Sequence, residues 1–322
     1  MSPRTLTPAT LEPATRPAFY FVGVTTGSSS IRSVFPRWAE ELGLGDVELV
    51  GIDVEPHAPV EQYRAVVAFL AADPASLGAL VTTHKIDLFH AARDLFDEVD
   101  PLAALMGEVS CLSKRDGLLR ASAKDPFSSG LALEAFAPVE GWRDAGREVL
   151  VMGAGGSAIA MDWYLSRPER GPARPAGVVL TDRSPERLAT AAAVHEQVAP
   201  DVPLRTVVVG SASDNDAVLA ELAPGALVVN ATGLGKDAPG SPLGPDARFP
   251  ERALVWELNY RGDLVFLEQA RAQESPRSLV VEDGWTYFVH GWTQVIAEVF
   301  DVAIPTRGPR FDRLSEIAAS TR

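Results

Sequence analysis

The chain has 322 residues, of which 46% are hydrophobic and 22% charged, a composition typical of a soluble globular protein large enough for two domains. Its net charge of −14 argues against nucleic acid or an anionic membrane as the main partner. The single Cys111 excludes an internal disulfide and fits a reducing cytoplasm, and no apolar run approaches the roughly 20 residues that span a bilayer.

The first half of the chain predicts a small α/β unit. Residues 1–17, rich in Pro, Thr and Ala, are expected to form a flexible tail that is neither a signal peptide nor an anchor. Apolar runs and amphipathic stretches then alternate, which predicts a mostly parallel sheet with strands over 19–25, 47–54 and 77–83 and helices ending near Leu44, over 60–72 and from Ile86. Around Arg115-Asp-Gly117, residues 108–112 and 117–122 predict a hairpin. A helix around 130–137 leads into the second half.

The second half predicts a doubly wound sheet, because short apolar strands alternate regularly with helices. Such a sheet binds its ligand at the carboxyl ends of the strands. The expected strands cover 148–152, 177–182, 204–209, 226–230, 253–258 and 279–281, and the helices between them begin near Gly156, Pro185, Asp214 and Asp263. Two further helices, over 285–300 and 310–320, end the chain.

A glycine turn follows the first of these strands. Gly153, Gly155 and Gly156 separate the strand from a predicted helix, which leaves backbone N–H groups and the positive end of the helix dipole available to a pyrophosphate. The next strand ends in Asp182, a carboxylate suited to bonding the adenosine ribose. Together these features predict a dinucleotide site.

In this order the motifs resemble the shikimate/quinate dehydrogenase family, over almost the whole chain after residue 17. An intact Gly-Ala-Gly-Gly turn is accompanied by divergent forms of six other family segments. These six stand here as Leu80-Val-Thr-Thr-His-Lys85, Leu105-Met-Gly-Glu-Val-Ser-Cys111, Ala123-Lys-Asp125, Asn230-Ala-Thr-Gly-Leu-Gly235, Glu257-Leu-Asn-Tyr260 and Gly284-Trp-Thr-Tyr-Phe-Val289.

The resemblance implies an N-terminal α/β substrate domain, a Rossmann-type doubly wound NAD(P) domain, and C-terminal helices that return to the substrate domain. The corresponding ranges are 18–126, 127–281 and 282–322. It also implies Lys85 and Asp125 as the catalytic pair that binds and deprotonates a substrate hydroxyl. Burial would lower the pKa of such a lysine and a neighbouring carboxylate would raise it. The sequence leaves open which effect is larger.

The remaining implied site residues fall into two groups. Substrate binding is expected from Ser29, Thr82, Ser110, Tyr260 and Gln294, and cofactor binding from Gly153, Ala154, Gly155, Gly156, Asp182, Arg183, Asn230, Ala231, Thr232 and Gly284. For Asp125 the structural alternative is an Asp-Pro turn with Pro126. For the serines near residue 29 it is ordinary turn chemistry, since no nucleophile elbow accompanies them.

Several substrate positions depart from the family pattern. Ile31 stands where the family has a second carboxylate-binding serine, and Gly291 stands where it has a glutamine. Its three ring-binding asparagines are replaced by Leu80, Ser110 and Ala123. Arg32 and Lys124 are cations that either lie near the substrate or face solvent. The departures predict a divergent member, unless the alignment slips at the one-residue deletion before Lys85 and shikimate is the substrate after all.

The cofactor prediction favours NAD, because a carboxylate at Asp182 accepts ribose hydroxyls and repels a 2′-phosphate. Arg183 could hold that phosphate, so NADP stays an alternative. No metal is expected, since His84 has no partner motif; it is expected to line the cleft or pack beside Lys85.

The predicted function is hydride transfer between NAD(P) and a secondary alcohol or ketone of a shikimate- or quinate-related cyclic compound, in the cytoplasm. The expected partner is a small-molecule substrate, with no nucleic acid or membrane partner and with a homodimer left open. The alternative is a non-catalytic, nucleotide-binding regulatory protein derived from this fold; the retained Lys85 and Asp125 argue against it.

Overall fold

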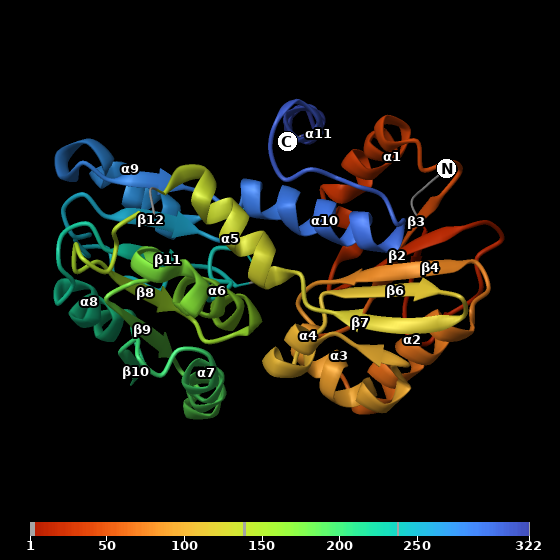
Figure 1. Ribbon diagram of the computed structural model, residues 1–322, viewed down its shortest axis with the longest axis horizontal. Coiled ribbons are helices and arrows are strands. Elements are labelled where there is room, and N and C mark those ends of the chain that lie inside the picture. Colours follow the sequence, from red (N-terminus) through yellow and green to blue (C-terminus); the bar gives the residue numbers. More distant parts are fainter. Residues whose placement is uncertain (1–3, 138–139, 237, 322) are drawn as a thin grey trace. The chain divides into compact units, whose positions relative to one another are not determined.

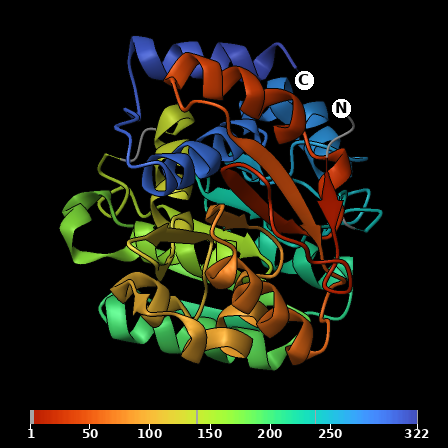
Figure 2. The same cartoon turned by 90° about the vertical axis from the view of Figure 1, so that its right-hand side faces the viewer.

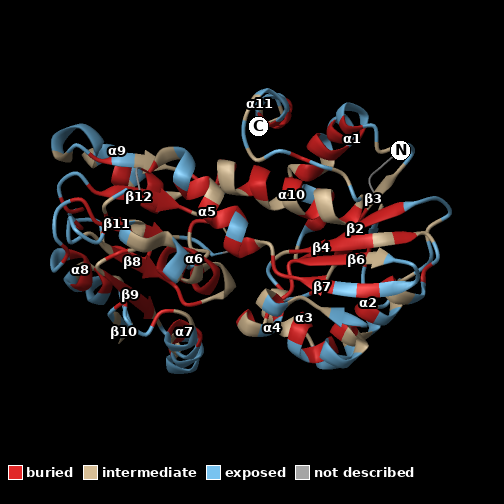
Figure 3. Ribbon diagram, viewed as in Figure 1, coloured by how far each residue is buried: buried red, intermediate tan, exposed pale blue. Residues whose placement is uncertain are grey.

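The computed structural model describes residues 4–137, 140–236 and 238–321 (Figure 1). The described chain divides into two compact units, one formed by Met1–Lys124 with Gly291–Arg322 and the other by Asp125–His290. Each unit contains one β-sheet, and the central strands are buried along most of their length, while many exposed residues lie on the helices (Figure 3). No helix in the described part of the chain is long and apolar enough to cross a membrane.

The first unit is built on a seven-stranded sheet with the order β1-β3-β2-β4-β6-β7-β5. Strands β1, β3, β2 and β4 are parallel, and β6 is antiparallel to both of its neighbours. The hairpin prediction is therefore confirmed. The strands are β1 (Thr5–Leu6), β2 (Ala18–Gly23), β3 (Glu48–Asp53), β4 (Ser76–Val81), β5 (Glu98–Val99), β6 (Cys111–Arg115) and β7 (Leu118–Ser122).

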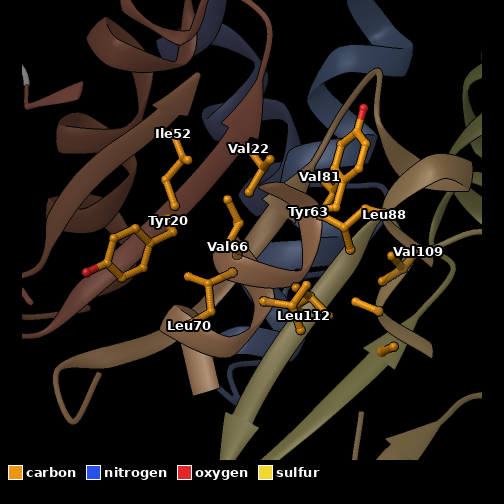
Figure 4. Close-up of a cluster of buried hydrophobic side chains, with 14 of the residues drawn as sticks. Tyr20, Val22, Ile52, Tyr63, Val66, Leu70, Val81, Leu88, Val109 and Leu112 are labelled. Atoms are coloured by element: carbon orange, nitrogen blue, oxygen red, sulfur yellow. The ribbon is translucent and has the colours of Figure 1, made fainter. Parts of the chain in front are cut away.

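Helices cover both faces of this sheet. Helices α2 (Val60–Ala72) and α3 (Lys85–Ala92) pack on one face, where Tyr63, Val66 and Leu88 join the apolar cluster shown in Figure 4. On the other face, Phe21 meets Trp292 of α10 (Trp285–Val299) with ring centroids 5.0 Å apart. Helix α1 (Ile31–Leu42) lies alongside α11 (Pro309–Ala319), as both ribbon views show (Figures 1 and 2). A short α4 (Pro101–Met106) precedes β6.

The expectation of a flexible tail before residue 18 is wrong for the part that the structure describes. Thr5 and Leu6 pair in parallel with Gly51 and Ile52 of β3, and Leu6 is buried. Arg4 donates to the carbonyl of Glu12 over 2.9 Å. The composition of this segment suggests disorder. The strand was missed because a two-residue pairing at a sheet edge depends on tertiary contacts, which leave no periodic pattern in the sequence.

The second unit is a six-stranded, fully parallel sheet with the order β10-β9-β8-β11-β12-β13. This is the Rossmann order, in which strands are added toward one side of the sheet from the first strand and toward the other side from the fourth, here β8 and β11. The strands are β8 (Glu148–Met152), β9 (Gly177–Asp182), β10 (Leu204–Val208), β11 (Leu227–Asn230), β12 (Leu254–Glu257) and β13 (Val280–Glu282).

Helices flank the second sheet as the alternating pattern predicts. Helices α8 (Ala212–Ala220) and α9 (Val265–Arg277) share one apolar cluster with β8, β11 and β12. Helix α6 (Gly156–Ser166) contacts both α5 (Asp125–Phe136) and α7 (Pro185–Val198). Helix α5 begins earlier than the expected residue 130, at Asp125.

Candidate active site

The predicted substrate residues of the first unit gather at one edge of its sheet. At this edge β2, β4 and β7 end and the antiparallel β6 begins. Ser29 follows β2, Thr82 and Lys85 follow β4, and Ser110 immediately precedes β6. Because parallel strands end at a common edge, residues far apart in sequence reach one surface.

Backbone and side-chain hydrogen bonds fix these connections. Thr82 Oγ1 donates to the Val22 carbonyl over 3.2 Å, and Lys85 N donates to the Thr82 carbonyl over 3.3 Å. Ser110 Oγ accepts from Lys124 N at 2.7 Å, which leaves its own hydroxyl hydrogen to be donated. The arrangement therefore offers the Ser110 hydroxyl as a donor, and the Thr82 hydroxyl as an acceptor, at the same edge as a half-buried lysine.

The two predicted catalytic residues each begin a helix. Lys85 is the first residue of α3 and is half-buried, and Asp125 is the first residue of α5 and is 5% exposed. Lys85 belongs to the first unit and Asp125 to the second. Pro126 occupies the first turn of α5, where proline is tolerated, so the Asp-Pro pair starts a helix instead of forming an isolated turn.

The other two predicted substrate residues lie on different units. Gln294 is half-buried on α10, three residues after Gly291, within the part of α10 that belongs to the first unit. Tyr260 lies in the second unit with Trp285 and Phe288, its ring centroid 5.4 Å and 4.7 Å from theirs. Tyr260 thus packs against two aromatic rings of its own unit.

Arg32 and Lys124 have partners within the first unit. Arg32 donates to the carbonyls of Thr26 and Leu49 over 3.2 Å and 3.0 Å. Burial lowers its pKa, and the charge of Asp53 opposes that shift. Lys124 forms an ion pair with Glu298. Both cations are thus partly buried and held by partners in the first unit, so the solvent-facing alternative is wrong for them, while a place near the substrate stays a prediction.

His84 is a core residue. It is 1% exposed, and its Nδ1 lies 3.2 Å from the Tyr63 hydroxyl. Burial lowers its pKa. Among the described residues, no group of three His, Cys, Asp or Glu side chains is arranged to hold a metal ion.

In the second unit, the glycine turn connects β8 to α6. Gly153 has φ +102°, and a Cβ added there would lie 2.7 Å from the Ala231 carbonyl oxygen. A Cβ added to Gly155 would meet nothing within 4 Å. The first glycine is thus required by the fold, whereas the second leaves open space at the start of a helix, as a bound pyrophosphate requires.

Asp182 lies beside this turn. Its Oδ2 accepts from Ala154 N at 2.8 Å and its Oδ1 accepts from Ser184 N at 2.9 Å. A carboxylate has about four lone-pair sites, so both oxygens keep capacity for ribose hydroxyls. Arg183 is exposed next to it.

The loop after β11 completes this edge. Ala231 N donates to the Met152 carbonyl at 2.8 Å, and Asn230 Oδ1 accepts from Thr232 N and Oγ1 at 3.1 Å and 2.7 Å. Gly284 N donates to the Asn259 carbonyl at 3.0 Å. The structure therefore places Gly153, Ala154, Asp182, Asn230, Ala231 and Thr232 at one edge of the second sheet, while Gly284 follows β13.

Glu257 and Glu108 are buried carboxyl residues to which the sequence analysis gave no role. Glu257 is fully buried at the end of β12. Glu108 is fully buried in the segment where Val109 N donates to the Lys85 carbonyl at 3.1 Å. The signal for Glu108 was present in the sequence, since it is the one charged residue of the segment Leu105-Met-Gly-Glu-Val-Ser-Cys111.

Comparison with known proteins gives the family. No family model matches the chain. A shikimate dehydrogenase (NADP(+)) of Symbiobacterium thermophilum is 31% identical over 218 residues, which are 67% of this chain and 68% of that protein. Another, of Methylocella silvestris, is 30% identical over 307 residues, which are 94% and 97% of the two chains.

A solved structure agrees with the fold. Quinate dehydrogenase from Corynebacterium glutamicum, in complex with NAD, superimposes with a TM-score of 0.67 at 19% identity, covering 95% of this chain and 99% of that one. At this identity the structural likeness shows the fold alone, and the family rests on the two relatives. With those relatives, the chain belongs to the shikimate/quinate dehydrogenase family of oxidoreductases.

Proposed function

We propose that this protein is an NAD-linked dehydrogenase that interconverts a secondary alcohol and a ketone on a shikimate- or quinate-related cyclic compound. We assign the substrate to the first unit and the dinucleotide to the second. The observation that carries the proposal is the glycine turn with Asp182 bonded across it. The two relatives are named for shikimate and NADP(+), so the family supports the reaction, and Asp182 is the residue that supports NAD as the nucleotide.

A second carboxylate strengthens the choice of NAD over NADP. Val209 N donates to the Asp182 carbonyl at 3.0 Å, so the segment after β10 runs beside Asp182. In that segment Asp214 Oδ2 accepts from Gly210 N and Ser211 N at 2.8 Å and 2.9 Å, and these bonds lower its pKa. The start of α8 is therefore capped by the chain's own anion, which is unfavourable for a 2′-phosphate.

The preference is tested by changing Asp182 to alanine. Removing the carboxylate takes away ribose acceptors and a repulsive charge, so NADH should bind more weakly and the preference over NADPH should narrow or reverse. Calorimetric titration of both nucleotides measures this. Asp201→Ala, which alters an exposed aspartate of the same unit, is the control and should keep the original preference. Tighter NADPH binding by the unmodified protein would contradict the assignment.

The residues of the chain supply the proton chemistry. Bound NAD would accept a hydride from the carbinol carbon. Lys85, as a neutral amine, would remove the hydroxyl proton, and the family resemblance gives Asp125 the role of its catalytic partner. Thr82 and Ser110 lie at the same sheet edge as Lys85 and would orient the ring by hydroxyl hydrogen bonds.

The substrate frame differs from one built for shikimate. Ile31, Leu80 and Ala123 are buried apolar residues, and Gly291 contributes no side chain. A substrate hydroxyl left unpaired at such a position costs about 1–3 kcal/mol. Shikimate itself should therefore be a poor substrate, and a related cyclic acid with a different hydroxyl or amino pattern a better one.

The proposal is tested by following nicotinamide reduction with shikimate, quinate, their amino analogues and cyclitols, each with both nucleotides. We expect turnover with at least one panel member and faster turnover with NAD. Shikimate reacting at an ordinary efficiency, about 10⁵ M⁻¹s⁻¹, would show that the substitutions reflect a slipped alignment. Nucleotide binding without turnover on any compound would favour the non-catalytic alternative, which no relative supports.

A further inference from the structure

Glu257 is a fully buried carboxyl whose hydrogen bonds come from neutral amides. Its Oε2 accepts from Asn230 Nδ2 at 2.7 Å, and its Oε1 accepts from Asn259 N and Nδ2 at 2.8 Å and 2.7 Å. Because all three partners are donors, the carboxyl oxygens must act as acceptors in every one of these contacts. The ionised form meets that requirement with acceptor lone pairs alone, whereas the neutral form carries an O–H, a further donor that faces the N–H groups of these contacts.

Asn230 and Asn259, which donate to Glu257, also form hydrogen bonds with the loop over residues 231–235. Asn230 turns its Nδ2 toward Glu257, so its Oδ1 faces Thr232 and accepts from both the N–H and the hydroxyl of that residue. The Leu234 carbonyl accepts from Asn230 Nδ2 at 3.3 Å and from Asn259 Nδ2 at 3.2 Å. The carboxylate thereby fixes the orientation of two amide groups, and these hold both ends of the loop.

This loop lies against the glycine turn. Ala231 N donates to the Met152 carbonyl, and the Ala231 carbonyl stands where a Cβ on Gly153 would clash. The contact falls between β8 and β11, the strands at which the direction of winding reverses. In a doubly wound sheet that crevice receives the ligand.

We propose that Glu257 is a positioning residue of the dinucleotide site, whose ionised carboxylate holds Asn230, Asn259 and the 231–235 loop in the conformation that binds the nucleotide. This rests on the proposed function, since it assumes that the glycine turn binds a dinucleotide. It assigns to Glu257 no contact with the substrate or the reacting atoms.

The same geometry makes nucleotide binding dependent on pH near neutrality. Burial raises the pKa of Glu257 to about 7; the amide donors oppose this shift, and the nearby Asp283 adds to it. Above that pH the carboxylate is ionised and the three donors are satisfied. Below it, the added proton weakens the acceptor strength of the carboxyl oxygens and places an O–H against amide donors, so affinity should fall as the pH is lowered through 7.

The test is NADH affinity, measured by fluorescence titration from pH 5.5 to 8.5. The unmodified protein should bind about tenfold more weakly at the acid end, the scale of one lost hydrogen bond to a charged group. Glu257→Gln presents an NH₂ group to amide donors at every pH, so it should bind weakly throughout with a flat profile. Glu251→Gln, an exposed glutamate before the same strand, is the matched control and should follow the unmodified protein.

Thermal unfolding without nucleotide identifies any variant that fails to fold. In that case Glu257→Asp decides the question, because it keeps the charge but is too short to reach all three donors. It should bind more weakly and shift the midpoint of the pH profile. Wild-type affinity and profile in either folded variant would overturn this inference alone. Absence of dinucleotide binding by the unmodified chain at every pH would overturn the proposed function and this inference with it.

Discussion

Replacing Lys85 by alanine is expected to lower turnover by roughly two to four decades, the usual scale for a general acid–base group. NADH affinity should be unchanged, because Lys85 lies in the first unit and the glycine turn in the second. Steady-state rates on the best compound of the panel, together with a nucleotide titration, separate the two effects.

Two further lysine variants sharpen this experiment. Lys85→Arg keeps the positive charge but cannot release its proton, so it should be nearly as inactive as the alanine variant. Lys114 lies toward the opposite edge of the sheet, where its amine donates to the Asp73 carbonyl. Lys114→Ala should therefore keep the wild-type rate. Normal turnover by Lys85→Ala would mean that another residue is the base.

Replacing Gly155 by alanine should abolish most nucleotide binding without harming the fold. Its φ of −82° suits any residue, and the added methyl group would meet no atom of the protein within 4 Å. The methyl group would enter the space that a pyrophosphate needs, so affinity should fall by at least about tenfold, or 1.4 kcal/mol. Titration of NADH and a thermal unfolding curve measure the two quantities.

Gly153→Ala provides the contrast. At this position the backbone has a positive φ and the new Cβ would clash with the Ala231 carbonyl, so both stability and affinity should fall. A Gly155→Ala protein that binds NADH normally would show that the dinucleotide does not approach this turn.

Hydrophobic patterning predicted most of the second unit. The strands of a doubly wound sheet are buried on both faces, so β8 and β9 appear in the sequence as continuous apolar runs. Polar residues at their ends, such as Asp182, then fall at the edge where ligands bind. The order of strands along the sequence is enough to predict that these residues lie at the ligand-binding edge, because parallel strands all end at that edge.

The missed features depend on contacts between distant residues. Arg32 resembles a substrate cation in sequence, and only the fold shows that it bonds the Leu49 carbonyl of β3. Glu257 appears in the sequence only as the first residue of a divergent family segment, and its partner Asn230 ends a different strand. Burial and donor geometry give such residues their roles, and neither quantity has a period or spacing that a single sequence displays.

The short strand β1 has a consequence for how the first sheet avoids association. Strand β3 would be the outermost member of a parallel sheet without Thr5 and Leu6, and its free N–H and C=O groups would form a template for a strand from another molecule. Thr5 and Leu6, which the composition did not mark as structured, therefore cover the edge of β3 and occupy its free hydrogen-bonding groups. A shortened chain that begins at β2 would keep every residue of the proposed site and still acquire an open template for aggregation.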